Sequence, residues 1–169
     1  MPISEEVLSN ELLHTGRLDR KRRGELAELA FMRKAAAMGF AVAKPWGESD
    51  RYDVVVSIGR VFSRVQIKSA WSIGPTRSYY RVKTQGGQRS CYSAAEIDFL
   101  VAYIFPHDAW YVFPVELVEN RAELCINARS RKSRFEPYRE AWHLMRPQES
   151  EAAVAKPVTA ATAAAGSVV

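Results

Sequence analysis

The segment from Tyr52 to Ala70 constrains the fold most, because it has the pattern of a β-hairpin. Two arms rich in Val and Ile flank Gly59-Arg60, a Gly-X pair that suits a tight two-residue turn. If these two residues form the loop, Ile58 pairs with Val61. That single pair fixes the register of the whole hairpin.

This register brings polar side chains together on one face of the hairpin. Asp53 lies opposite Gln66, and Lys68 shares their face because side chains alternate along a strand. The other face carries the aliphatic side chains of Val54, Val56, Val65 and Ile67. An acid, an amide and an amine therefore converge. Such a mixture of polar side chains also occurs on strand faces that are merely solvated. The preceding helix has to show whether this face is of that kind or forms a functional site.

A helix is predicted from about Lys21 to Met38, ended by Gly39. At helical spacing, Glu28 falls near the middle of an apolar stripe formed by Leu29, Phe31, Met32, Ala35, Ala36, Met38 and Gly39. An unpaired carboxylate in that place is costly. Glu28 should therefore either form a buried ion pair with an Arg or point into a functional cleft.

The remaining elements give the fold class. Beyond the hairpin, the sequence predicts a short acidic helix over Glu5–Leu13, strands over Ala41–Ala43, Tyr79–Thr84, Ile97–Phe105, Trp110–Val115 and Leu124–Asn127, and a terminal helix over Pro137–Met145. This order indicates an α+β protein with an α/β core, a mixed sheet flanked by helices. We expect a lead-in over residues 1–20, one domain over 21–146 and a disordered Ala-rich tail over 147–169.

Composition fits a soluble globular protein in the cytoplasm. The chain has 169 residues, long enough for one domain, with 47% hydrophobic and 25% charged residues. No apolar run approaches the roughly 20 residues of a membrane span, and the N-terminus lacks a signal pattern. Cys91 and Cys125 have no zinc-ligand spacing, which favours a structural role in a reducing compartment.

The net charge of +5 suits a polyanionic partner. Basic residues gather at the start of the first helix, on one predicted strand face that also carries Tyr79, and after the last strand. The candidates for DNA binding are Lys21, Arg22, Arg23, Tyr79, Arg81, Lys83, Arg129, Arg131, Lys132 and Arg134. Each group could bind a phosphate backbone or could simply be solvated. Basic residues at a helix start oppose the helix dipole, so helix stability does not explain the first group.

If Glu28 meets Asp53, two carboxylates are aimed at one point and suit Mg²⁺, which prefers oxygen ligands. The Gln66 side-chain oxygen and the Ile67 backbone carbonyl are further candidate ligands. Lys68 could orient the attacking water or stabilise charge on a phosphate. Phosphodiester hydrolysis is the natural reaction of such a set.

Asp53 and Gln66-Ile67-Lys68, after Glu28 on a preceding helix, resemble the PD-(D/E)XK nuclease superfamily. The segment Gly24–Leu29 resembles the helical acid motif of that group. The Gln-X-Lys variant, Tyr52, and the later Asp98-Phe-Leu-Val-Ala-Tyr and Trp110-Tyr-Val-Phe-Pro-Val are similar to its branch of group I intron-associated homing endonucleases. That branch is close in fold to archaeal Holliday-junction resolvases. The match spans roughly Arg20 to Val118.

The resemblance implies a restriction-endonuclease-like fold, Mg²⁺-dependent DNA cleavage with Mn²⁺ as a possible substitute, and often dimers or tetramers. Carried over by position, Glu28, Asp53 and Lys68 form the catalytic core. Gln66 stands where most members have a second acid, so it removes one negative charge from the metal site and should weaken metal affinity. Tyr52 stands in place of the family's Pro, a mild departure.

The sequence therefore favours a Mg²⁺-dependent DNA endonuclease. The alternative is a catalytically silent nucleic-acid-binding module of the same fold, in which Glu28, Asp53 and Lys68 can be exchanged without loss of function. A third interpretation, an assembly protein, predicts no salt-dependent affinity for DNA.

Overall fold

The computed structural model of the chain describes residues 19–47, 49–71, 79–86 and 90–147. The predicted helix over Glu5–Leu13 and the tail from residue 148 lie outside these residues. In the described part of the chain, no helix is long and apolar enough to cross a membrane.

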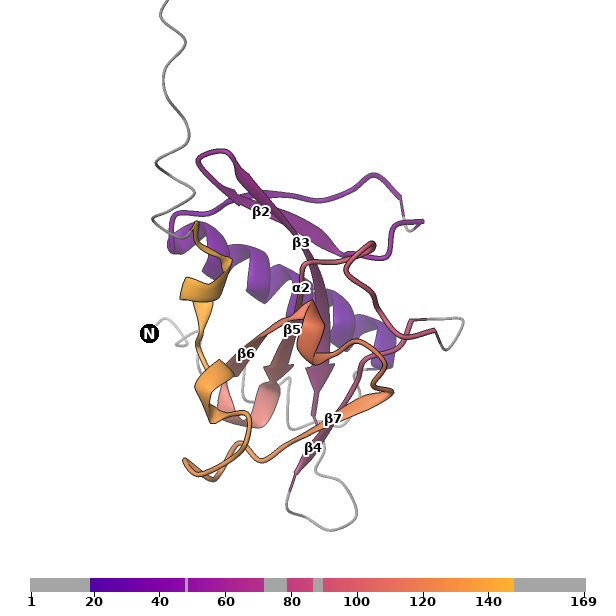
Figure 1. Cartoon of the computed structure of the whole chain (residues 1–169), viewed down its shortest axis with the longest axis vertical. Coiled ribbons are helices and arrows are strands. Elements are labelled where there is room, and N and C mark those ends of the chain that lie inside the picture. Colours follow the sequence, from indigo (N-terminus) through magenta and orange to yellow (C-terminus); the bar gives the residue numbers. More distant parts are fainter. Residues whose placement is uncertain (1–18, 48, 72–78, 87–89, 148–169) are drawn as a thin grey trace, which may run out of the picture.

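A five-stranded mixed sheet forms the centre of the domain (Figure 1). Its strands, in spatial order, are β1 (Ala41–Ala43), β2 (Val54–Ile58), β3 (Val61–Ala70), β5 (Phe99–Ile104) and β6 (Ala109–Pro114). All neighbours are antiparallel except β3 and β5, which run parallel. The α+β class and the mixed sheet predicted from the sequence are confirmed.

Different elements cover the two faces of this sheet. Helix α2 (Arg20–Ala37) crosses behind β3 in Figure 1 and packs on the face that carries Val54, Val65 and Ile67. The antiparallel pair of β4 (Tyr80–Lys83) and β7 (Glu123–Ile126) covers the opposite face. The predicted strand near Tyr79 therefore exists, but it lies in a second small sheet.

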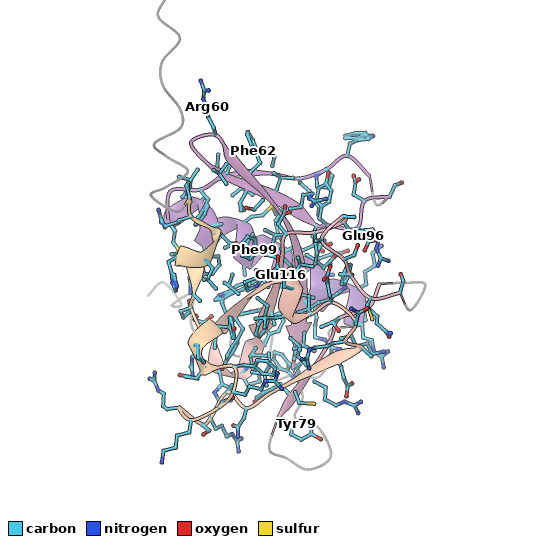
Figure 2. All side chains as sticks on the ribbon, in the orientation of Figure 1. Arg60, Phe62, Tyr79, Glu96, Phe99 and Glu116 are labelled. Carbon is cyan, nitrogen blue, oxygen red and sulfur yellow. The ribbon has the colours of Figure 1, made fainter. Side chains whose placement is uncertain are left out.

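The hairpin has the register that its turn residues predicted. Ile58 pairs with Val61, and Val55 lies opposite Arg64. Gly59 has a φ of 61°, a left-handed conformation that glycine adopts without strain. Figure 2 shows Arg60 and Phe62 projecting from the tip of this hairpin, away from the rest of the sheet.

Helix α2 begins and ends where its sequence signals stand. The Asp19 carboxylate accepts a hydrogen bond from the Arg22 backbone N–H at 2.8 Å, and Gly39 follows the helix with a φ of 86°. The buried face, however, is centred on Ala27, Phe31 and Ala35. This corrects the predicted stripe, because Leu29, Ala36 and Gly39 are exposed and Glu28 lies at the edge of the buried face.

The predicted terminal helix over Pro137–Met145 is wrong. Two short 3-10 helices, Glu136–Tyr138 and Trp142–Met145, stand there, separated by Glu140 with a left-handed φ of 51°. The Glu140 carboxylate accepts hydrogen bonds from the Trp110 backbone N–H, the Trp142 indole and Lys34. These tertiary bonds hold the residue in a conformation that interrupts a helix.

Candidate active site

Asp53 is the residue immediately before β2, and the hairpin fixes its position. Its backbone N–H donates to the Val65 carbonyl at 2.9 Å, which continues the ladder between β2 and β3. Its Oδ2 accepts hydrogen bonds from Gln66 Nε2 at 2.5 Å and from the Ile67 backbone N–H at 2.7 Å. The structure therefore brings Asp53 against Gln66, as the register predicted, and also against the backbone N–H of Ile67.

The Gln66 side chain is buried, with 5% of its surface exposed. Besides its bond to Asp53, its Nε2 donates to the Ile67 carbonyl at 3.2 Å. Because a carboxylate and a carbonyl only accept, the amide presents its nitrogen to both groups. The amide would have to turn to offer its oxygen as a metal ligand.

The pKa of Asp53 is raised above its ordinary value. Burial is the largest cause, and the hydrogen bond from the Ile67 N–H partly opposes it. The negative charge of Glu28 raises this pKa further, whereas the positive charge of Lys68 lowers it. Both predicted partners thus lie within electrostatic reach of Asp53.

Glu28 reaches the same place from helix α2. It lines a hollow of about 310 Å³ whose walls are Lys21, Glu25, Glu28, Lys44, Pro45, Gly47, Asp50, Tyr52 and Asp53. Its Oε2 lies 2.7 Å from Lys44 Nζ. Glu28 therefore points into a hollow and also has a counter-ion. That counter-ion is a half-exposed lysine, so the buried arginine considered from the sequence is wrong.

Lys68 lies on the same strand as Gln66, with its ammonium group over the ring of Tyr92. The distance from Lys68 Nζ to the ring centroid is 5.3 Å, and the guanidinium of Arg51 lies 4.7 Å from the same centroid. The Tyr92 side chain is buried, so it gives both cations a fixed aromatic neighbour.

Asp98 supports the site without belonging to the predicted catalytic set. Its two oxygens accept bonds from the Arg64 guanidinium, and Oδ2 also accepts from the Arg64 backbone N–H at 2.6 Å. The Asp98 N–H in turn donates to the Arg64 carbonyl. These bonds join the start of β5 to β3, the strand that carries Gln66 and Lys68.

The predicted DNA-binding residues differ in their exposure and in whether their charges are paired with an acid. Lys21 lines the hollow, and the exposed cluster at Arg129, Arg131, Lys132 and Arg134 lies beyond β7. Arg81, by contrast, forms two-pronged hydrogen bonds with Glu123. Figure 2 places Tyr79 at the end of the molecule opposite the hairpin tip. Arg22 and Lys83 are exposed, and Arg23 is half-buried.

Lys44, the cation that contacts Glu28, could hardly be predicted from the sequence. Sixteen positions separate the two residues, and no periodic pattern links them. They meet because β1 packs against α2, and Lys44 directly follows β1. The requirement that Glu28 have a cationic partner was the only available signal. Trp46, which follows two residues later, is completely exposed.

The donor set fits a hard divalent cation. Asp53 and Glu28 supply carboxylate oxygens to one hollow, and the Ile67 carbonyl adjoins Asp53. Among the described residues, no group of three or more His, Cys, Asp or Glu forms a metal site. Any metal here would therefore depend on two acids together with neutral oxygens and water, as Mg²⁺ sites often do.

Comparison with known proteins gives the class of this fold. The sequence model of the PD-(D/E)XK endonuclease family matches residues 18–145, and the chain belongs to that family. It is similar to the solved structure of a bacterial homing endonuclease, I-Ssp6803I, with 32% identity and a TM-score of 0.69 over 83% of this chain and all of that one. No match was found among curated proteins.

A second solved structure is more distant. It is the Holliday junction resolvase Hjc from Archaeoglobus fulgidus, with 17% identity and a TM-score of 0.44 over 63% of this chain and 84% of that one. The restriction-endonuclease-like fold expected from the sequence is confirmed by the family match and the homing endonuclease. Glu28, Asp53, Gln66 and Lys68 all lie inside the matched range.

Proposed function

We propose that this protein is a Mg²⁺-dependent endonuclease that hydrolyses phosphodiester bonds in DNA. One observation carries the proposal: the Asp53 carboxylate, held by the Ile67 N–H and the Gln66 amide, lines the same hollow as Glu28. The membership of the PD-(D/E)XK endonuclease family supports this reaction class. The similarity to a homing endonuclease supports DNA as the substrate.

Each residue of the site has a distinct proposed role. Glu28 and Asp53 would hold the ion, with the Ile67 carbonyl beside them and Gln66 as a neutral ligand or a brace for Asp53. A bound Mg²⁺, or Mn²⁺ in its place, supplies an acidified water and stabilises charge on the phosphate. Lys68 supplies a positive charge on the same strand face, where it can orient a water or neutralise a phosphate oxygen.

The basic residues would bind the DNA backbone. Lys21 stands at the hollow itself, and the exposed Arg129–Arg134 cluster offers a second set of cations. We also propose that the chain acts as a homo-oligomer in the cytoplasm, with residues 21–146 as its nuclease domain. A homing type of recognition needs a longer DNA footprint than one domain of this size covers.

A silent DNA-binding module remains the second candidate, and Gln66 is the observation that favours it. Its amide replaces the second acid of the family pattern, so this position adds no negative charge beside Asp53. Fewer negative charges weaken the binding of a divalent ion.

Cleavage assays on supercoiled plasmid and on branched DNA, each with Mg²⁺ or with EDTA, test the proposal. Wild type is compared with Asp53→Ala and Lys68→Ala, all checked for folding by circular dichroism. We expect Mg²⁺-dependent nicking by wild type and loss of at least about a hundredfold in rate in both variants. Equal DNA binding by all three proteins without any cutting would favour the silent module. No cutting and no binding would favour an assembly role.

A further inference from the structure

The hollow carries an excess of acidic groups, and one of them already has a cation. Its lining includes the acids Glu25, Glu28, Asp50 and Asp53 and the lysines Lys21 and Lys44. Lys44 Nζ lies 2.7 Å from Glu28 Oε2. The ammonium group of Lys44 is therefore already bound to the Glu28 carboxylate, which the proposed function assigns to a divalent cation.

Lys44 stands among several acids and not beside Glu28 alone. Glu25, Asp50 and Asp53 line the same hollow. A cation entering between Glu28 and Asp53 would meet Lys44 at contact distance. Like charges at that distance repel each other, which opposes metal binding as long as Lys44 stays in place.

The Lys44 side chain is free to move. It is 53% exposed, against 21% for Glu28, and a lysine stem can swing its ammonium group over several ångströms at little cost. An ion pair with this exposure is also weak, because water screens it and ordering the chain costs entropy. A divalent ion with two carboxylate ligands can therefore replace it.

We propose that Lys44 is the resident counter-ion that the divalent metal displaces from Glu28, and that the released ammonium group binds the DNA backbone at the edge of the hollow. This inference rests on the proposed function. Lys44 lines the hollow together with Lys21, so the released ammonium group and that second lysine would offer two cations to a phosphate at the same hollow. The metal and DNA then strengthen each other's binding, because the metal frees a cation for the phosphates.

Titration of Mn²⁺ by calorimetry tests the first half of this inference. We compare wild type with Lys44→Met, which keeps most of the stem and removes the charge. Lys21→Met is the matched control, because it removes the same charge from the same hollow. We expect Lys44→Met to bind Mn²⁺ about fivefold more tightly than wild type, and Lys21→Met to change this affinity less than about twofold.

The coupling to DNA is measured in a Lys68→Met background, where cutting should not interfere. Anisotropy of a labelled duplex gives the DNA affinity with Mn²⁺ and with EDTA. We expect Mn²⁺ to tighten DNA binding at least about threefold more in Lys68→Met than in the Lys44→Met, Lys68→Met double variant. An equal factor in the two proteins would overturn the coupling.

The outcomes separate this inference from the proposed function. If wild type binds no Mn²⁺, the metal-dependent nuclease itself is contradicted. If wild type binds Mn²⁺ and Lys44→Met binds it equally or more weakly, only the displacement of Lys44 is contradicted. Lys44→Gln, which keeps a hydrogen-bond donor for Glu28, replaces Lys44→Met if the latter fails to fold.

Discussion

Asp53, a proposed metal ligand, lies in an environment that disfavours its charge. Its carboxylate is largely buried, and the nearby Glu28 adds to the cost of ionising it, so its pKa is raised. An acid with a raised pKa makes the folded state less stable once it is charged. A charged Asp53 therefore does not help to stabilise the fold, which makes it an informative site for a substitution that tests the proposed function.

We expect Asp53→Asn to lose cleavage while its melting temperature stays equal to wild type or rises. The Asn side-chain oxygen can still accept the bonds from Gln66 and the Ile67 N–H. The advantage over wild type should be absent at low pH and grow as the pH rises through the raised pKa of Asp53, above 3.8. Thermal unfolding from pH 4 to 8 checks this, and a lower melting temperature at neutral pH would contradict it.

Gln66 offers a complementary test, because it holds the position of the missing acid. Gln66→Glu would place a second carboxylate against Asp53 in a buried position. In EDTA we expect this variant to lose about 2 kcal/mol of unfolding free energy from repulsion and desolvation. Saturating Mn²⁺ should restore most of that loss. Denaturant titrations in both conditions decide, and a loss unchanged by Mn²⁺ would count against a metal at this position.

At the level of elements, the parallel pair of β3 and β5 depends on Asp98 and Arg64. The Asp98 carboxylate accepts from both the backbone and the guanidinium of Arg64, so one side chain joins the start of β5 to β3. Burial tends to raise the pKa of Asp98, but the bonds and charge of Arg64 outweigh it, and the pKa lies below the ordinary value. Asp98 thus supports the strand that carries Gln66 and Lys68.

We expect Asp98→Asn to lower the free energy of unfolding by about 1 kcal/mol at pH 7. A lowered pKa contributes stability above the ordinary value of 3.8, and that contribution disappears as the pH falls through the lowered pKa. The gap between wild type and variant should therefore narrow in acid. Urea titrations at pH 7 and pH 3 measure it. Exposed Glu116→Gln is the control, and an unchanged gap would contradict this role.

The sequence predicted those elements whose conformation depends on neighbours in the chain. The glycine turn at Gly59 fixed the hairpin register, and with it the meeting of Asp53 and Gln66. The prediction of a terminal helix was wrong because long-range hydrogen bonds hold Glu140 at a left-handed φ. Lys44 was missed for the same physical reason, since its contact with Glu28 exists only once β1 packs on α2.

For the whole molecule, the distribution of paired and unpaired cations predicts which residues would bind DNA in the proposed function. Lys132 is exposed, and the pair between Arg131 and Glu136 spans 3.4 Å at an arginine that is 87% exposed. Arg81 is already neutralised by Glu123 at 2.6 Å. The cluster beyond β7 should therefore contribute more counter-ion release than Arg81 does.

We expect the double variant Arg131→Ala, Lys132→Ala to reduce the slope of log affinity against log salt by about 2 for a labelled duplex. Arg81→Ala should change this slope by less than about 0.5, because its charge is already paired. Anisotropy titrations from 50 to 200 mM salt in EDTA, roughly the range in which counter-ion release is measurable, give the slopes. Equal changes of the slope in the double variant and in Arg81→Ala would contradict this distinction between cations that bind DNA and cations that are paired within the fold.

The most direct test of the site asks whether Glu28 from α2 and Asp53 from the hairpin hold one ion. Mn²⁺ is titrated into wild type, Glu28→Gln and Asp53→Asn, each confirmed as folded. We expect each substitution to weaken Mn²⁺ binding by at least about tenfold and to abolish plasmid nicking, because both carboxylates line the same hollow. Wild-type Mn²⁺ affinity in either variant, together with cleavage by that variant, would contradict a shared metal site.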